Sequence, residues 1–328
     1  MLLDVRNLRT HFHTRRGVVR AVDGVSLSVD RGETLGLVGE SGSGKSVVCS
    51  SIMRLVPAPA GRIVSGQLWF EGEDLLTKSR REMREIRGRK ISLILQDPQS
   101  SLNPSFTVAS QVGEAIRLHQ GLRGDELRSS VIKILSRVGI PEAERRMKDF
   151  PHQLSGGMRQ RVAGAIALSC QPALLLADEP TTSLDVTVQA QYLRLLRELQ
   201  EEFAFGLIFV THDFGIVAKM CDQVAVMYAG RISESGSTRQ IFNHPAHPYS
   251  KALLSSIPRL STRGRRLPTI DGQPPIPIDL PPGCSFAPRC PEVMEICRRE
   301  APEETEVAQG HRASCWLHRD TENGPRAD

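Results

Sequence analysis

The chain of 328 residues is long enough to form one large domain or two modest ones around a buried core. Hydrophobic residues make up 40% and charged residues 24%, as in soluble globular proteins, and a net charge of +5 does not by itself demand nucleic acid as a partner. No apolar run approaches the roughly 18–20 residues that span a bilayer, and the N-terminus lacks the apolar core of a signal peptide, so we expect a cytoplasmic protein.

The first third of the chain predicts strands around a glycine-rich loop. Residues 2–8 and 18–29 alternate apolar and polar side chains, which is typical of half-buried strands, and residues 65–70 are rich in strand formers. Residues 33–56 predict a strand, a loop and a helix in succession. The loop, Gly39-Glu40-Ser41-Gly42-Ser43-Gly44-Lys45-Ser46, matches the pattern GxxxxGK[ST].

This loop has the composition of a phosphate-binding site. Glycines let successive backbone N–H groups wrap a phosphate, and the helix that follows points its positive end at the anion. Lys45 would neutralise the β and γ phosphates, and Ser46 would hold Mg²⁺. A dinucleotide fold is excluded because no GxGxxG occurs here. The expected nucleotide contacts in the loop are Gly39, Ser41, Gly42, Ser43, Gly44, Lys45 and Ser46.

The middle of the chain alternates buried strands with helices. Residues 90–98 predict a buried strand stopped by a proline, residues 107–169 are helical, and residues 173–180 predict a short apolar strand. Asp178 and Glu179 end that strand. After a phosphate loop, we expect Asp178 to bind Mg²⁺ directly or through one of its ligands, and Glu179 to act as the general base that polarises water.

The following segments complete an α/β pattern. Residues 186–203 predict an amphipathic helix, residues 206–213 a buried strand, residues 214–221 a helix, and residues 223–236 a hairpin that turns at Ala229-Gly230. Gln96 and His212 each follow a buried strand, where α/β sheets place their ligand contacts. Taken alone, Gln96 is an ordinary residue at the end of a surface strand and His212 a core histidine.

The order of three motifs identifies the resemblance. The phosphate loop is followed by Leu154-Ser155-Gly156-Gly157-Met158-Arg159-Gln160-Arg161 and then by the acidic pair of residues 178–179. Over residues 1–245 the chain resembles an ABC-transporter ATPase subunit. The resemblance implies a P-loop NTPase (RecA-like) α/β core, an antiparallel β subdomain, and a helical signature subdomain at about residues 100–170.

The resemblance also implies a role for each motif. Ser155, Gly156 and Gly157 form the signature that completes the nucleotide site of a partner subunit. Asp185 belongs to the D-loop. Gln96 touches Mg²⁺, water and the transmembrane partner, and His212 contacts the γ-phosphate. An aromatic residue of the first hairpin usually stacks on adenine; Phe12 is the candidate, although a buried phenylalanine is the plain alternative.

Further segments narrow the resemblance to the dipeptide/oligopeptide import branch. They are Met158 of the signature, residues 96–108, the stretch DEPTTSLDVTVQAQ and residues 244–258. This branch implies an ATP-hydrolysing subunit at the cytoplasmic face of the bacterial inner membrane. Its expected partners are a second, related ATPase subunit, two transmembrane permease subunits and an extracytoplasmic peptide-binding protein. The sequence does not name the cargo.

Residues 246–328 predict a C-terminal extension in which residues 258–283 form a proline-rich connector. Cys284, Cys290, Cys297 and Cys315 then crowd one segment. Four thiolates suit zinc or an iron–sulfur cluster, free structural thiols being the alternative. The absence of CxxC disfavours a zinc ribbon, and relatives that carry this tail imply a 4Fe–4S cluster, either structural or redox-sensing. His311 and His318 are possible substitute ligands.

Two other functions remain open. A nucleic-acid-handling ABC ATPase could use the cysteine tail as a binding module, although such proteins usually carry long coiled coils or two cassettes, which are missing here. That alternative requires salt-sensitive binding to DNA or RNA. A redox sensor would instead change its ATPase activity when the cluster is oxidised.

Overall fold

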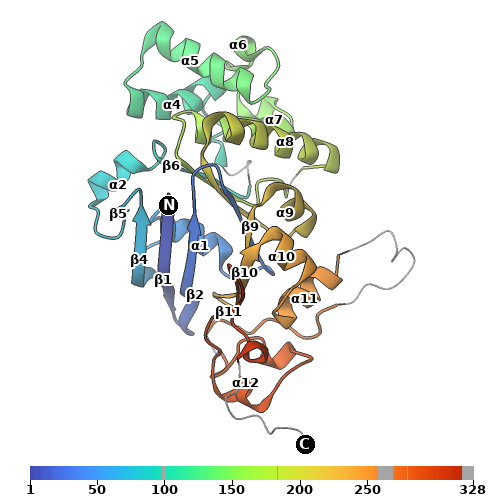
Figure 1. The fold of residues 1–328 in the computed structure, drawn as a ribbon. Coiled ribbons are helices and arrows are strands. Elements are labelled where there is room, and N and C mark those ends of the chain that lie inside the picture. The colour runs from blue at the N-terminus through green and yellow to red at the C-terminus, as the bar shows by residue number, and fades with distance from the viewer. Residues whose placement is uncertain (98–100, 183, 258–268, 279, 320–328) are drawn as a thin grey trace, which may run out of the picture.

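The computed structural model describes residues 1–97, 101–182, 184–257, 269–278 and 280–319. Two sheets occupy the middle of the molecule, a helical lobe lies at one end, and the tail, here residues 269–278 and 280–319, lies at the other (Figure 1). Residues 258–268 and 279 of the predicted connector lie outside the described residues.

The larger sheet carries the parallel core. The order of its strands is β11-β12-β10-β9-β3-β8-β7-β6. The five strands β9, β3, β8, β7 and β6 run parallel to one another. Each is short and almost wholly apolar, as strands covered on both faces must be. Their bounds are β3 (Thr34–Val38), β6 (Ile91–Ile94), β7 (Leu174–Asp178), β8 (Gly206–Thr211) and β9 (Gln223–Tyr228).

Alternate residues of these strands enter two different cores. Leu174 and Leu176 of β7 pack with helix α1 (Lys45–Ile52) and the smaller sheet. Leu175 and Ala177 pack on the opposite face with α7, α8 and α9. The bounds of these helices are α7 (Gly156–Leu168), α8 (Val186–Phe203) and α9 (Phe214–Met220), so the helix predicted at residues 186–203 is confirmed.

The smaller sheet is antiparallel, with the order β2-β1-β4-β5. Its strands are β1 (Leu3–Thr14), β2 (Gly17–Val29), β4 (Gly61–Phe70) and β5 (Glu73–Asp74), followed by α2 (Arg80–Ile86). The strand predicted at residues 2–8 is therefore confirmed but extends six residues further. Thr10 of β1 hydrogen-bonds Ser51 of α1 at 2.8 Å between buried hydroxyls, which fixes this sheet over the helix that starts the nucleotide loop.

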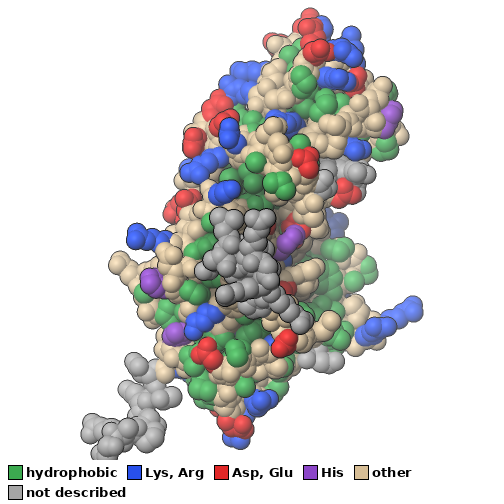
Figure 2. Space-filling view, turned by 90° about the vertical axis from the view of Figure 1, so that its right-hand side faces the viewer, with side chains coloured by type: hydrophobic (Ala, Val, Ile, Leu, Met, Phe, Trp, Pro, Cys, Tyr) green, Lys and Arg blue, Asp and Glu red, His purple; other side chains and the backbone are tan. Residues whose placement is uncertain are grey.

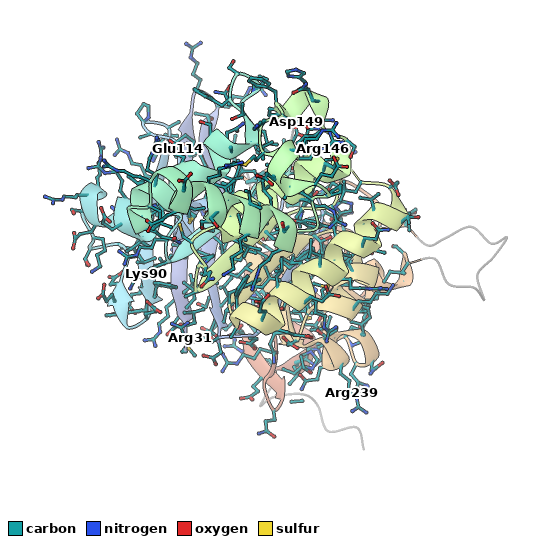
Figure 3. The ribbon with its side chains drawn as sticks, turned by 90° about the horizontal axis from the view of Figure 1, so that it is seen from above. Arg31, Lys90, Glu114, Arg146, Asp149 and Arg239 are labelled. Carbon is teal, nitrogen blue, oxygen red and sulfur yellow. The ribbon has the colours of Figure 1, made fainter. Side chains whose placement is uncertain are left out.

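The helical lobe contains α4 (Val108–Gln120), α5 (Gly124–Arg137), α6 (Ala143–Arg146), the short helix η1 (Pro151–Gln153) and α7. The first N–H groups of α4 donate to the carbonyls of Asp149 and Met147, so the segment before η1 caps that helix. Arg146 and Asp149 form an ion pair of 2.9 Å and are seen together at the edge of the lobe in Figure 3. These contacts hold the segment that leads into Ser155.

The predicted hairpin is β9 with β10 (Arg231–Ser237), and it turns at Ala229-Gly230, both of which have positive φ. Helices α10 (Thr238–Asn243) and α11 (Pro248–Ser255) follow. The tail contains η3 (Ala287–Arg289), α12 (Glu295–Arg299), β11 (Thr305–Ala308), β12 (His311–Ala313) and η4 (Trp316–His318). The sequence did not predict β11 and β12; β12 pairs with β10 and so joins the tail to the main sheet.

Candidate active site

The glycine loop runs from the end of β3 to the start of α1 and curls around the side chain of Lys45. Gly44 has φ 105°, and a Cβ there would lie 2.1 Å from the carbonyl oxygen of Ala21, so only glycine fits. Lys45 is 5% exposed, and its Nζ donates to the carbonyl oxygens of Gly39 at 2.8 Å and Glu40 at 2.9 Å. The loop therefore holds an ammonium group at its centre.

Ser46 and Asp178 meet where α1 begins and β7 ends. The Ser46 hydroxyl donates to Asp178 Oδ1 at 3.0 Å, although the two residues are 132 positions apart. Burial raises the pKa of the Asp178 carboxyl, against the opposing hydrogen bond from Ser46. Burial also lowers the pKa of Lys45, against the attraction of Glu179 and Asp178. Both groups are thus desolvated, and each would gain from an ion of opposite charge.

Glu179 is the centre of a second cluster. Its carboxylate accepts a hydrogen bond from Gln96 Nε2 at 2.9 Å and from the Thr182 hydroxyl at 3.0 Å, and lies 3.3 Å from His212 Nδ1. The Glu179 side chain is 14% exposed and that of His212 is 61% exposed. Gln96, Glu179 and His212 follow the adjacent strands β6, β7 and β8, so the parallel sheet brings them to one edge.

The backbone of Glu179 is strained. Its φ of 45° lies in the left-handed region, which non-glycine residues seldom adopt. The N–H of Glu179 donates to the carbonyl of Val210 in β8, so the ladder continues while the chain turns out of the strand. This conformation directs the carboxylate toward Gln96 and His212 rather than along the sheet. Sequence patterns did not predict this backbone conformation. They did not predict Thr182 either, because its contact with the Glu179 carboxylate depends on that conformation.

The other predicted residues stand apart from these clusters. Ser155 caps α7 by accepting from the N–H of Met158, and Asp185 caps α8 by accepting from two N–H groups. A Cβ on Gly157 would lie 2.8 Å from Val188, whereas one on Gly156 would meet nothing within 4 Å. Phe12 is half-buried, and its ring packs over Gly61, where an added Cβ would lie 2.7 Å from it.

Comparison with known proteins decides the family. The family described as "ABC transporter" matches residues 22–182, and "Oligopeptide/dipeptide transporter, C-terminal region" matches residues 233–297. The dipeptide transport ATP-binding protein DppD of Bacillus subtilis is 49% identical over 316 residues, covering 96% of this chain and 94% of the relative. The chain belongs to the ABC transporter ATP-binding subunits of the dipeptide and oligopeptide branch.

A second relative and a solved structure agree with this assignment. The oligopeptide transport ATP-binding protein OppD of Haemophilus influenzae is 49% identical and covers 96% of this chain and 97% of its own. The ATP-binding cassette MJ0796 was solved as a dimer in a post-hydrolysis state with ADP and phosphate. It is 27% identical to this chain with a TM-score of 0.65, and the match covers 72% of this chain and 99% of the solved chain. This subunit is thus an ATPase with the P-loop NTPase fold, and the relatives support transport rather than the nucleic-acid alternative.

The prediction of an iron–sulfur cluster, or of any metal bound by the tail of this ABC subunit, is wrong. Within the ranges that the structure describes, no group of three or more His, Cys, Asp or Glu side chains could hold a metal ion. Cys284, Cys290, Cys297 and Cys315 do line one pocket, but its volume is about 10 Å³, at the lower limit for one water molecule.

The thiols behave instead as small apolar groups. Cys297 packs with Trp316 and Ala287 in a miniature core, and Cys284 lies against it. Burial raises the pKa of Cys315 to about 11, so that thiol is protonated at neutral pH. The proposed substitute ligands are also occupied, since His311 Nε2 lies 2.8 Å from Glu234 and His318 Nε2 lies 3.0 Å from the carbonyl of Ala246.

A buried carboxylate attaches the tail in place of a metal. Glu234 of β10 is 1% exposed, and its oxygens accept from the N–H groups of Ala246 and His247 as well as contacting His311 of β12. This single side chain joins the main sheet, the start of α11 and the tail. Three partners offset the desolvation of a charge that would otherwise be costly to bury.

His247 makes the attachment of α11 sensitive to acid. Its Nδ1 accepts from the N–H of Tyr249 at 3.0 Å, and burial lowers its pKa to about 4. The unfolded chain binds this proton near pH 6.5, so stability falls as pH drops from 6.5 to 4. We expect the free energy of unfolding to decrease by about 2–3 kcal/mol between pH 7 and pH 4.5 through this group.

The variant His247→Asn keeps an oxygen acceptor for the helix cap but cannot titrate. Urea unfolding at several pH values should therefore give a flatter profile for this variant than for the wild type. Equal slopes in the two proteins between pH 4.5 and pH 7 would contradict the assignment.

Proposed function

We propose that the chain is the ATP-hydrolysing subunit that powers import of di- or oligopeptides through a type I ABC transporter. The observation that carries the proposal is the Glu179 cluster at the carboxyl edge of the sheet, beside the buried Lys45 and the Ser46–Asp178 contact. An ATPase needs a cation for the phosphates, oxygen donors for a metal, and a base for water. The relatives named for dipeptide and oligopeptide transport supply the substrate class.

In this proposal the side chains divide the binding of ATP and its hydrolysis among them. Lys45 binds the β and γ phosphates, with the backbone of Gly39, Ser41, Gly42, Ser43 and Gly44 around them. Glu179 accepts a proton from the attacking water, Gln96 contacts that water, and His212 contacts the γ-phosphate. Phe12 is proposed to stack on the adenine through its exposed face.

The residues present fit a magnesium ion. Ser46, Asp178 and Gln96 offer hydroxyl, carboxylate and amide oxygens, which are the donors that Mg²⁺ prefers. Burial already raises the pKa of Asp178, so a cation beside it would favour the ionised form. When bound, the ion would neutralise charge on the phosphates.

We infer that the active unit is a head-to-tail pair of cassettes. Ser155, Gly156 and Gly157 lie at the start of α7 and are exposed or half-buried, so they are open to a nucleotide held by another subunit. Asp185 is proposed to lie at the same interface. The dimeric solved cassette supports this arrangement. The second subunit is proposed to be a related but distinct chain.

The remaining partners are two transmembrane permease subunits and an extracytoplasmic peptide-binding protein. Among the helices that the structure describes, none is long and apolar enough to cross a membrane. We propose that residues 1–245 form the nucleotide-binding domain, that about 100–170 form its helical subdomain, and that residues 246–328 form the extension. Attachment at the cytoplasmic face of the inner membrane then depends on the permeases.

Charge on the molecular surface agrees with this proposal. On the face shown in Figure 2, Lys and Arg side chains are interspersed with Asp and Glu rather than gathered into one basic surface. A broad basic surface is what a nucleic-acid-binding face would present.

The test is to co-purify the chain from membranes with its permeases, reconstitute the assembly in vesicles, and measure ATP hydrolysis with and without peptide-loaded binding protein. Stimulation by dipeptides or oligopeptides is the expected result. Hydrolysis stimulated by DNA or RNA, or a chain that comes out soluble and alone, would contradict the proposal.

A further inference from the structure

The region that follows the hairpin contacts the nucleotide loop at Glu40. Arg289 of the tail and Tyr249 of α11 both contact it, from 249 and 209 positions away in sequence. Glu40 is the residue directly after Gly39, so it lies inside the phosphate loop itself. The tail and α11 therefore contact the loop that is proposed to bind ATP.

Arg289 holds the side chain of Glu40 in a bidentate pair. Its Nη1 lies 2.7 Å from Glu40 Oε2 and its Nη2 lies 3.0 Å from Oε1. The Arg289 side chain is only 3% exposed. Its Nε donates to the carbonyl of Asp271, and its guanidinium lies 5.9 Å from the ring centre of Tyr228. These contacts fix the orientation of the guanidinium that pairs with the Glu40 carboxylate.

Tyr249 holds the backbone of the same residue. The N–H of Glu40 donates to the Tyr249 hydroxyl at 2.9 Å. Tyr249 is fully buried, with its ring 4.6 Å from that of Tyr228 and 5.3 Å from that of Phe286. These rings join α11, β9 and the tail into one rigid block, so the hydroxyl has little freedom to move.

The remaining polar group of Glu40 faces the catalytic lysine. Its carbonyl oxygen accepts from Lys45 Nζ at 2.9 Å and from the N–H of Ser43 at 3.2 Å. All three polar groups of Glu40 are therefore engaged, two by residues outside the loop and one by Lys45 and Ser43 within it. An unpaired Glu40 carboxylate would also repel a polyphosphate, and Arg289 cancels that charge.

We propose that Arg289 and Tyr249 are positioning residues that hold the phosphate loop in its ATP-binding conformation through Glu40. The inference rests on the proposed ATP site at Lys45. In this inference the region after residue 245 increases the affinity of the loop for nucleotide. A tail that only bound a metal or only stabilised the fold would not affect that affinity. Through this contact, any movement of the tail changes how tightly the loop binds phosphate.

The experiment compares Arg289→Ala, Tyr249→Phe and wild type in the assembled transporter, with ATP hydrolysis measured over a range of ATP concentrations. We expect Arg289→Ala to raise KM for ATP about tenfold, as contacting residues in one hydrogen-bonded network allow, while kcat changes less than about threefold. Tyr249→Phe should act in the same direction with a smaller effect. Arg299→Ala is the matched control, because Arg299 is exposed on α12 and its ion pair is with Glu295 of the same helix.

The background variant Glu40→Gln separates positioning from general stability. In the Glu40→Gln protein Arg289 has no negative charge to neutralise. Adding Arg289→Ala should therefore raise KM for ATP by less than about threefold relative to Glu40→Gln alone. If Arg289 only stabilised the tail through Tyr228 and Asp271, the substitution would have the same effect in both backgrounds. That equality would overturn the inference.

Binding of a fluorescent ATP analogue to the full chain, at a temperature where every variant is folded, provides the second measurement. Weaker binding by Arg289→Ala but not by Arg299→Ala supports the inference, and unchanged binding contradicts it. If wild-type assemblies fail to hydrolyse ATP, the proposed function itself fails. If they hydrolyse ATP and Arg289→Ala retains the wild-type KM, only the positioning role fails.

Discussion

Glu179→Gln should remove ATP hydrolysis while leaving ATP binding intact. The amide cannot accept a proton from water, so the rate should fall by about 10²- to 10⁴-fold, the usual contribution of a general base. The amide oxygen can still accept from Gln96 and Thr182, which now bond the carboxylate. Single-turnover hydrolysis in the assembled transporter measures the rate, and binding of a fluorescent ATP analogue measures affinity.

Glu201→Gln is the matched control for this experiment. Glu201 lies on α8, is 71% exposed and contacts only Arg197 of the same helix among the described residues, so its removal should change neither measurement. A Glu179→Gln protein that hydrolyses ATP at more than about a tenth of the wild-type rate would exclude Glu179 as the base.

Lys45→Met should weaken ATP binding itself. Methionine keeps the apolar stem in its buried channel but removes the charge that Gly39 and Glu40 hold at the loop centre. Hydrogen bonds to charged groups contribute about 1.5–3 kcal/mol, so affinity for MgATP should fall by about 10- to 100-fold. Equilibrium binding to the full chain is the measurement.

The control is Lys133→Ala, because Lys133 is an exposed residue of α5 in the helical lobe. Thermal unfolding without nucleotide should give similar midpoints for wild type and Lys45→Met. Equal ATP affinities of these two proteins would refute the phosphate-binding role. The contrast with Glu179→Gln separates binding from chemistry within one site.

Much of the active site could be predicted from the sequence because the parallel sheet brings the ends of its strands, and the side chains there, close together. Gln96, Asp178 and His212 are far apart in the chain, but each lies at or just after the end of a parallel strand, and such strands end at one edge of the sheet. Recognising the motifs was therefore enough to group these side chains. The left-handed backbone of Glu179 could not be read from the pattern, since it depends on a hydrogen bond to β8.

The tail could not be predicted because its contacts have no periodic signal. Cysteine spacing suggested a metal, but whether four thiols can ligate depends on the space between them, and the pocket that they line measures about 10 Å³. The Arg289–Glu40 pair links residues 249 positions apart, and nothing in either segment marks the other as its partner. Long-range polar contacts of this kind are set by the docked surfaces.

The pairing of β12 with β10 has a consequence for shortened forms of the chain. Glu234 and Ser235 of β10 register with Ala313 and Arg312, and the N–H of Ser314 donates to the carbonyl of Ser233. Cutting away the tail would leave the backbone of β10 as an open sheet edge, which readily templates pairing with other chains. Precipitation of a truncated protein would therefore indicate pairing through the exposed edge of β10. It would give no information on whether the tail affects ATP binding.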